Sequence, residues 1–331
     1  MKKRNKKVSV GIVGVGHLGK YHVKHLTAID NVECGGLYDI DEARATVISD
    51  KYNVKSHDSL ESLLGDCDAV TIVTPTDTHF NVASDCLNAG KHVFIEKPIT
   101  KSVTEAEQLL TLANTKKVLI QVGHIERLNP ALIPLKNYSV SPKYIEIQRL
   151  APYDIRGTDV PVVLDKMIHD IDILLFLVKS EVESIDANGI SILTDSIDIA
   201  NARIRFKNGT IANLTSSRVA KDNVRKAKIF QKDLYITIDF LLVLTEIYRV
   251  LDPDEPDSNS IQNVPFHYGG KTKRIVYEKP DLPSFDALKA ELENFTNSVK
   301  GSATPIVDGQ AGKNALELAT NIHDLILEDL H

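Results

Sequence analysis

The sequence predicts a two-domain protein that begins with an α/β domain built on a doubly wound parallel sheet. Short apolar runs alternate with amphipathic segments from the N-terminus to about residue 122. Continuous apolar strands of this kind indicate a parallel sheet covered on both faces by helices. The first run leads directly into a glycine-rich turn at residues 14–19. At 331 residues the chain is also long for one hydrophobic core, which predicts a second domain.

The elements of the first domain follow from the apolar pattern. Strands are predicted at Val8–Val13, Val32–Tyr38, Ala69–Val73, His92–Ile95 and Val118–Val122. Helices are predicted between them at Leu18–Ala28, Asp41–Lys51, Thr78–Ala89 and Val103–Asn114. His22 and His25 lie on the first of these helices and are predicted to be surface or packing residues.

The glycine-rich turn predicts a dinucleotide site. Its spacing is Gly14-x-Gly16-x-x-Gly19, with His17 and Leu18 before the last glycine. The first glycine permits a tight turn, the second lets the backbone approach a pyrophosphate, and the third allows the helix to pack closely on the strand. The following helix offers free N–H groups to the phosphates. A glycine turn that serves only a sharp bend is the alternative.

Asp39 favours NAD over NADP as the cofactor. It stands at the end of the predicted second strand, 20 residues after Gly19. A carboxylate at this place accepts hydrogen bonds from the adenosine ribose and repels a 2′-phosphate. No arginine directly follows Asp39. The strand, turn, helix and acid together predict a Rossmann domain that binds NAD.

Two further loops are expected to border the cofactor, because open α/β sheets bind ligands at the carboxyl ends of their strands. The first loop contains Thr74, Pro75, Thr76, Asp77, Thr78 and His79. Asp77 or Thr78 is predicted to cap the next helix, and capping alone would explain this loop. The second contains Glu96 and Lys97, where a lysine can donate to a substrate hydroxyl or transfer a proton. The alternative for Lys97 is a solvated surface residue paired with Glu96.

A polar stripe interrupts the apolar segment Val162–Val178. Asp165, His169 and Asp172 stand at i, i+4 and i+7, so they share one face of a helix with about 3.6 residues per turn. Burying such a stripe is costly, which indicates that it lines a wet, working cleft. A metal site is the alternative, but no further ligand cluster lies near in the sequence. We predict no metal.

Composition excludes several classes of protein. The formal net charge of −6 argues against nucleic acid as the main partner, because phosphate binding needs a basic face. Cys34, Cys67 and Cys86 contain no C-x-x-C pair and predict reduced, intracellular thiols. The basic residues 2–7 precede an apolar stretch too short for a secretory signal. No segment has the ~20 apolar residues of a membrane span. These features predict a cytoplasmic protein without membrane association.

Three motifs together resemble one family. The Gly14–Gly19 turn, the segment 88–98 that ends in Glu-Lys-Pro, and Asp165-x-x-x-His169 are similar to the glucose–fructose oxidoreductase/inositol dehydrogenase family (Gfo/Idh/MocA). The resemblance covers nearly the whole chain. Residues 122–130 and 156–158 look most like the branch that oxidises the 3-hydroxyl of UDP-N-acetyl sugars. Many members have a glycine where this chain has Met167, which predicts a different contact beside the cofactor or substrate.

The resemblance implies a second domain with a large, mostly antiparallel open sheet. The expected domains are therefore a Rossmann domain at 1–122 and a substrate-binding and oligomerisation α+β domain at 123–331. Strands are predicted at Ser184–Ile192, Ile197–Phe206, Thr210–Ser216, Arg225–Gln231, Leu234–Phe240 and Val243–Val250. Helices are predicted at Phe285–Val299 and Gly309–Leu330, after an exposed loop at Asp252–Asn263. The resemblance also implies a homodimer or homotetramer.

The resemblance further implies an NAD-dependent sugar dehydrogenase, with C3 of a UDP-N-acetylhexosamine as the expected position of oxidation. The expected catalytic residues are His169 as general base, Asp165 as its orienting partner and Lys97 as a donor to the same oxygen. Substrate contacts are expected from His124, Arg127 and Arg156, since guanidinium groups suit phosphate oxygens; surface ion pairs are the alternative for the arginines. A dehydrogenase of free polyols or sugars such as inositol and a non-catalytic NAD-dependent sensor remain open.

Overall fold

The structure, a computed structural model, describes residues 7–154, 160–257 and 259–330. Contacts among the described residues divide the chain into two compact units. Unit 1 is formed by Met1–Leu128 and Asp286–Glu317, and unit 2 by Asn129–Phe285 and Leu318–His331. The expected domains divide the chain once, after residue 122. In the structure each unit combines two separate stretches, because the chain returns to unit 1 near its C-terminus.

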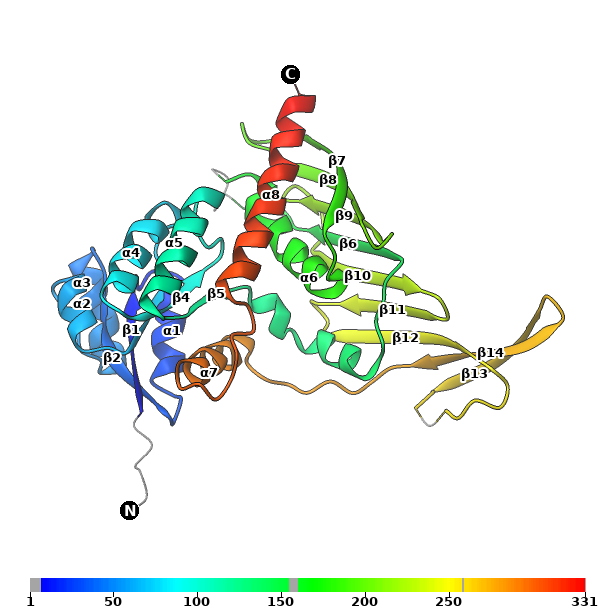
Figure 1. The fold of residues 1–331 in the computed structure, drawn as a ribbon, viewed down its shortest axis with the longest axis horizontal. Helices are drawn as coiled ribbons and strands as arrows, with labels where there is room; N and C mark the ends of the chain where they lie inside the picture. Colours follow the sequence, from blue (N-terminus) through cyan, green and yellow to red (C-terminus); the bar gives the residue numbers. More distant parts are fainter. Residues whose placement is uncertain (1–6, 155–159, 258, 331) are drawn as a thin grey trace, which may run out of the picture. The chain divides into compact units, whose positions relative to one another are not determined.

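Unit 1 contains a parallel sheet in the order β2-β1-β3-β4-β5 (Figure 1). The strands are β1 (Val8–Val13), β2 (Val32–Tyr38), β3 (Ala69–Ile72), β4 (His92–Glu96) and β5 (Ile120–Gly123). The helices include α1 (Gly19–Leu26), α2 (Glu42–Tyr52), α3 (Leu60–Gly65), α4 (Thr76–Asn88), α5 (Val103–Lys116) and α7 (Ala287–Val299), with the start of α8 (Gly309–Asp329). The predicted doubly wound parallel sheet is confirmed, whereas the short helix α3 was not predicted.

The return of α7 to unit 1 has a packing cause. Phe94 of β4 lies edge to face with Phe295 of α7, with ring centroids 5.7 Å apart. Leu292 of the same helix is also buried in the core of unit 1. Burying a side chain of this size contributes roughly 1.5–3 kcal/mol. The apolar face of α7 therefore packs this returning segment of the chain on the core of unit 1.

Unit 2 contains a sheet in the order β13-β14-β12-β11-β10-β6-β9-β8-β7. Its strands are β6 (Tyr144–Leu150), β7 (Val182–Ile190), β8 (Ile199–Phe206), β9 (Ile211–Ser217), β10 (Val224–Gln231), β11 (Leu234–Asp239), β12 (Leu244–Leu251), β13 (Gln262–Tyr268) and β14 (Lys271–Glu278). Strands β6 and β9 pair in parallel and the other pairs are antiparallel. The large, mostly antiparallel sheet is thus confirmed.

Three strands of this sheet were not predicted. In β6, apolar residues that face the core alternate with Glu146, Gln148 and other residues of intermediate exposure. Strand β13 is exposed at all but one residue, and β14 is exposed or partly exposed except at Val276 and Glu278. The alternation in β6 is itself a strand signal that was overlooked, whereas β13 and β14 lack a continuous buried apolar face that would indicate a strand.

The segment Val162–Val178 was expected to form one regular α-helix, and the structure differs. It begins with a π-helical turn at Val163–Met167 (η3) and continues as α6 (Ile168–Val178). A π turn is wider than an α turn, so residues on its two sides are shifted around the helix axis. The predicted stripe is correspondingly uneven. Asp165 and His169 are half-buried, whereas Asp172 is fully buried.

A buried ion pair joins α6 to the sheet of unit 2. Arg149 of β6 donates from Nε and Nη2 to the carboxylate of Asp170, at distances of 2.8–3.0 Å. Both side chains are almost completely buried. A guanidinium that binds a carboxylate with two nitrogens fixes orientation as well as distance. The pair therefore fixes the turn of α6 that carries His169.

In the described part of the chain, every helix is too short or too polar to traverse a lipid bilayer. The cytoplasmic location stays a prediction.

We expect Arg149→Met to destabilise the protein by about 3–5 kcal/mol, because it leaves the Asp170 carboxylate buried without its cation. The double variant Arg149→Met/Asp170→Leu should lose less, since it removes both charges. Urea unfolding followed by circular dichroism measures both. The exposed pair of Lys207 and Glu181 is the control, and Lys207→Met should cost less than about 1 kcal/mol. A double variant as unstable as the single one would contradict this account.

Candidate active site

A pocket of about 530 Å³ lies at the carboxyl ends of the strands of unit 1; we call it the strand-end pocket. Of the predicted cofactor residues, it is lined by Gly14, Gly16, His17, Leu18, Asp39, Thr74, Pro75, Glu96 and Lys97. The other residues of its lining are Val13, Tyr38, Ile40, Arg44, Val73, Asp77, Thr78 and Val82. This is the edge at which open parallel sheets bind ligands.

The three glycines of the turn have different surroundings. A Cβ atom on Gly14, whose φ is +85°, would lie 2.8 Å from the carbonyl oxygen of Val73. A Cβ on Gly19 would lie 2.0 Å from the carbonyl oxygen of Gly14, so no side chain fits there. Gly16 has open space at its Cβ position, where the backbone can approach a ligand. The turn thus suits a pyrophosphate group, and Gly19 serves packing instead of lining the pocket.

Asp39 holds the backbone in place at one end of the pocket through two hydrogen bonds. Its carboxylate accepts a hydrogen bond of 2.8 Å from the N–H of Val15, inside the glycine turn. It also accepts one of 2.9 Å from the N–H of Asp41. The side chain is only 4% exposed. A carboxylate held in this way can accept hydrogen bonds from a ribose, as the sequence predicted.

Arg44 is a pocket residue that the sequence analysis missed. Its Nη1 lies 3.3 Å from Asp39 Oδ1, and its Nη2 lies 2.9 Å from Asp41 Oδ2. No arginine stands directly after Asp39, whereas Arg44 stands five residues later. Asp41 caps α2 by accepting from the N–H of Arg44, and this first helical turn directs the guanidinium back toward Asp39. The signal that the sequence offered was an arginine in the first turn of the helix that follows Asp39.

The loop after β3 begins its helix earlier than predicted. Helix α4 starts at Thr76, and its N-cap is Pro75 without a side-chain cap. The expectation that Asp77 or Thr78 caps the helix was therefore wrong. The hydroxyl of Thr78 instead donates within the loop, to the carbonyl oxygen of Pro75 or to Thr74 Oγ1, both at 2.7 Å. Thr76 lies outside the pocket lining.

His79 holds two loops together from behind the pocket. Its Nδ1 lies 2.9 Å from the carbonyl oxygen of Pro98, and its Nε2 lies 2.9 Å from that of Thr74. Burial lowers the pKa of His79, although these two carbonyl groups oppose the effect. A neutral imidazole has one N–H and donates to one carbonyl at a time. We find His79 buried in the protein and not on the pocket surface.

Glu96 is tied to α1 by a histidine. His22 Nε2 lies 3.1 Å from Glu96 Oε1, and the N–H of Lys97 donates to Glu96 Oε2 at 3.3 Å. His22 is fully buried and packs edge to face on Phe94. It is therefore a packing residue, one of the two expected possibilities, with a polar role in addition.

The ionised form of Glu96 is favoured. Burial opposes ionisation of its carboxyl group, but the hydrogen bond and charge of His22 outweigh this effect, with help from Lys97, and the pKa of Glu96 is lowered. Gly123 at the end of β5 closes the other side, because a Cβ there would lie 2.9 Å from Glu96 Oε2. The carboxylate is thus confined beside Lys97, which lines the strand-end pocket.

The predicted catalytic residues of unit 2 stand at the junction of η3 and α6. The carboxylate of Asp165 lies 3.5 Å from the ammonium of its neighbour Lys166, and both side chains are about one-third exposed. His169 is half-buried one helical turn later. Asp172 is fully buried, which agrees with a structural role within the unit. The catalytic roles of Asp165 and His169 stay predictions.

The predicted substrate residues have separate places. His124 follows β5 and is buried in unit 1. Arg127 lies in the short helix η1 (Ile125–Leu128), and its Nη1 donates to the carbonyl oxygen of Ile306 at 3.2 Å. The alternative role of Arg127, a surface ion pair, stays open. Arg156 falls outside the described residues.

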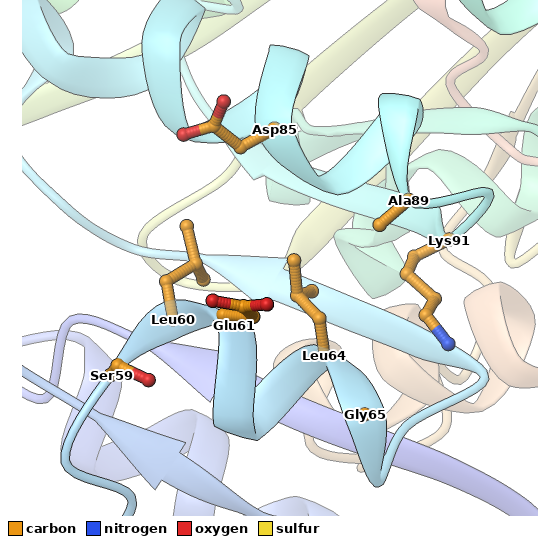
Figure 2. A pocket seen from close by; sticks show the side chains of 8 residues that line it. All are labelled: Ser59, Leu60, Glu61, Leu64, Gly65, Asp85, Ala89 and Lys91. Atoms are coloured by element: carbon orange, nitrogen blue, oxygen red, sulfur yellow. The ribbon is translucent and has the colours of Figure 1, made fainter.

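A second pocket lies away from the strand ends, between α3 and α4 (Figure 2). Figure 2 shows Leu60 and Leu64 of α3 on one side and Asp85 and Ala89 of α4 on the other. It contains none of the predicted site residues. Among the residues that the structure describes, no group of three histidine, cysteine, aspartate or glutamate side chains is placed to hold a metal ion.

Comparison with protein families agrees with this geometry. Residues 8–124 match the model of an oxidoreductase family with an NAD-binding Rossmann fold, Gfo/Idh/MocA. Residues 153–235 match the model of a C-terminal domain of the same family.

Individual relatives match almost the whole chain. A UDP-N-acetylglucosamine 3-dehydrogenase of Acidithiobacillus ferrooxidans is 36% identical, over 94% of this chain and 95% of its own. A myo-inositol 2-dehydrogenase of Thermotoga maritima is 27% identical, over 93% of each chain. A solved structure of the Acidithiobacillus ferrooxidans enzyme superposes with a TM-score of 0.88, covering 98% of this chain and 99% of that one.

We expect the ionised carboxylate of Glu96 to stabilise the folded state, and this contribution to be lost in acid. Its pKa is lower in the folded chain than its ordinary value of 4.5, so the unfolded chain binds more protons as the solution becomes acidic. The stabilising contribution is complete above pH 4.5 and is lost as the pH falls through the folded-state pKa. Urea unfolding at several pH values should give a shallower acid slope for Glu96→Gln than for the native chain. Glu61→Gln, at an exposed position of α3, is the control, and equal slopes for all three proteins would contradict the assignment.

Proposed function

The chain belongs to the Gfo/Idh/MocA family of NAD-binding oxidoreductases, and we propose that it oxidises a secondary hydroxyl group of a sugar, specifically the C3 hydroxyl of a UDP-N-acetylhexosamine. The observation that carries the proposal is the place of Lys97. Its side chain lines the same pocket as the glycine turn and Asp39. A proton donor beside a nicotinamide site suits oxidation of an alcohol.

The proposed reaction converts a secondary alcohol into a ketone and releases one proton. The glycine turn and Asp39 would hold NAD, which would supply the acceptor for the hydride that leaves the carbon. Lys97 donates a hydrogen bond to the reacting oxygen and stabilises the negative charge that develops on it. His169 takes the hydroxyl proton and passes it to solvent. Asp165, four residues earlier, orients the imidazole.

A sugar nucleotide is the favoured substrate class. The relative with 36% identity is a UDP-N-acetylglucosamine 3-dehydrogenase, and the match extends over both units. Arg127 and Arg156 would bind the diphosphate, because a guanidinium group can donate two parallel hydrogen bonds to phosphate oxygens. His124, at the end of β5, would contact the sugar. An inositol-like polyol is the second candidate, since an inositol dehydrogenase matches at 27% identity over most of the chain.

We also propose that the protein forms a homodimer or homotetramer through one face of the sheet in unit 2. On this face five aromatic rings form a row across neighbouring strands: Tyr144, Phe230, Tyr235, Tyr248 and Tyr277. Adjacent centroids are 4.5–5.6 Å apart, and each side chain is half-buried. We call this set the aromatic row. Aromatic residues are enriched at protein interfaces.

The proposed activity predicts formation of reduced NAD with UDP-N-acetylglucosamine or UDP-N-acetylgalactosamine as substrate. His169→Asn and Lys97→Met should each lower kcat by about 10²–10⁴-fold, the usual contribution of proton transfer. Binding of NADH, measured by its fluorescence, should remain in His169→Asn, because this residue acts on the substrate alone. Lys207→Met, at an exposed position, is the matched control for the loss of a lysine.

Three outcomes distinguish the candidates. Turnover of free inositol or glucose without turnover of UDP-sugars would replace the sugar-nucleotide proposal with the polyol dehydrogenase. Binding of NAD without turnover of any sugar in the panel would favour the sensor. Unchanged turnover in the double variant Lys97→Met/His169→Asn would refute the proposed mechanism.

If the protein self-associates as proposed, light scattering coupled to size-exclusion chromatography should give the molar mass of a dimer or tetramer. Tyr235→Lys/Tyr248→Lys places two charges in the middle of the aromatic row and should shift the protein to monomer, because unpaired charges are costly in an interface core. Tyr268→Lys changes an exposed tyrosine of β13 that is outside the row and should leave the mass unchanged. A native monomer, or a double variant of native mass, would refute this interface.

A further inference from the structure

A buried histidine contacts the strand-end pocket through one of the residues that line it. His22 of α1 is fully buried, and its Nε2 lies 3.1 Å from Glu96 Oε1. Glu96 and Lys97 line the pocket, whereas His22 does not. An ionised carboxylate can only accept, so the Nε2 atom of His22 carries the proton in this contact. His22 can therefore influence a bound molecule only through a neighbouring side chain, and Glu96 is its hydrogen-bond partner.

The carboxylate of Glu96 is held on both of its oxygen atoms. Oε1 faces His22, and Oε2 accepts from the N–H of Lys97 at 3.3 Å. A Cβ atom on Gly123 would lie 2.9 Å from Oε2, so the backbone of β5 approaches this oxygen closely. The side chain of Glu96 is 15% exposed and has little space to turn. Because one of the donors is the backbone of Lys97, the position of the carboxylate also fixes the start of the lysine side chain.

Packing alone does not account for a histidine at this position. The ring of His22 lies edge to face with Phe94, with centroids 5.5 Å apart. Its Nδ1 atom is buried and has no hydrogen-bond partner among the residues that the structure describes. A buried polar atom without a partner destabilises the folded state. An apolar ring could pack on Phe94 without this cost, and the hydrogen bond to Glu96 is what the imidazole supplies instead.

We propose that His22 is a positioning residue for the oxidation: by holding the Glu96 carboxylate beside Lys97, it raises the rate of the chemical step without touching substrate or cofactor. The inference rests on the proposed function, in which Lys97 donates a hydrogen bond to the reacting oxygen. A carboxylate beside an amine favours the protonated amine, which is the form that can stabilise negative charge. A carboxylate in a fixed position also limits where the ammonium group can lie.

The ionisable groups that face Glu96 agree with this role. Burial opposes ionisation of its carboxyl group, but the hydrogen bond and charge of His22, with help from Lys97, lower the pKa of Glu96. His79 also faces Glu96, but burial lowers the pKa of His79, so it supplies little charge near neutral pH. The pocket lining contains five further titratable side chains: His17, Tyr38, Asp39, Arg44 and Asp77. Without His22, burial would raise the pKa of Glu96, and its carboxyl group would become protonated at a higher pH.

Steady-state kinetics with UDP-N-acetylglucosamine compare the native chain with His22→Leu and His22→Gln. Leucine removes the donor, whereas glutamine carries an N–H group at a similar distance from the backbone. We expect His22→Leu to lower kcat by at least ~10-fold, since misplacing a reacting group by about 1 Å can cost ~100-fold. The KM for NAD and the dissociation constant of NADH should stay near their native values, because His22 is outside the pocket lining. His22→Gln should keep most of the native kcat.

His25→Gln is the matched control for the loss of a buried histidine from α1. His25 is the next histidine of this helix, and its Nε2 lies 3.3 Å from Asp286 Oδ2 instead of a pocket residue. This substitution should leave kcat near the native value. For every variant, kcat is referred to the number of sites counted by NADH titration, so that a loss of folded protein does not lower it.

Two further measurements separate positioning from a loss of structure. In His22→Leu the acid limb of the kcat profile should move to higher pH, because the pKa of Glu96 rises when its donor is removed. His22→Gln should keep the native profile. In the background of Glu96→Gln, which has no charge to be held, His22→Leu should lower kcat by a smaller factor than in the native chain.

Acetylation of Lys97 tests the inference without any sugar. Acetic anhydride reacts with an uncharged amine, so the rate at which Lys97 is acetylated, measured by mass spectrometry relative to the exposed Lys207, reports the charge beside it. This rate should be several-fold higher in His22→Leu than in the native chain and in His22→Gln. Should His22→Leu fail to fold, His22→Asn, whose side chain is shorter than that of histidine, replaces it in every comparison.

The proposal is overturned if His22→Leu keeps the native kcat, if His22→Gln loses as much as His22→Leu, or if Lys97 is acetylated equally fast in all of them. If the native chain oxidises no sugar and acetylation still responds as expected, the proposed function is refuted and the positioning of Lys97 by His22 stands.

Discussion

The contact between His22 and Glu96 is the interaction on which the rest of unit 1 depends. It joins the helix that follows the glycine turn to the end of β4, and it holds the mostly buried carboxylate beside Lys97. Phe94 packs against His22 on one side and against Phe295 of α7 on the other. The aromatic core and the polar contact therefore support each other. A buried carboxylate without such a partner would cost several kcal/mol.

Asp39 has a comparable place at the second strand. Its carboxylate organises the backbone of the glycine turn through Val15 and the start of α2 through Asp41. The group that is predicted to recognise the ribose is therefore also a structural group. This double use explains how Arg44 can be held at the pocket without a ligand. The acid was predicted from its place at the end of the second strand, 20 residues after Gly19, but its partners appear only when β2 and α2 are folded.

Unit 2 places its predicted catalytic residues by different means. The pair of Arg149 and Asp170 anchors α6 on the sheet, and the π turn before it changes the direction of Asp165 relative to the helix. The uneven burial of the stripe follows: Asp172 faces the interior, whereas Asp165 and His169 keep partial exposure. Three residues on one face of a regular α-helix would be buried to a similar extent. The different burial of these polar residues therefore separates Asp172 from the other two. The burial of Asp172 agrees with a structural role, and the catalytic roles of Asp165 and His169 stay predictions.

The sequence by itself determined the parallel sheet, most strands of the second sheet and the glycine turn, because apolar periodicity and glycine spacing are local properties of the chain. It also supplied Asp39, Glu96 and Lys97, since residues at the ends of parallel strands meet at one edge. Only the tertiary structure decided the roles of His22, Arg44 and α7. Their partners are distant in sequence or lie around a helical turn, and no local pattern records a contact that forms when separate elements pack. The start of α4 and the π turn were likewise decided by packing, which overrides the weak preferences of single residues for the ends of helices.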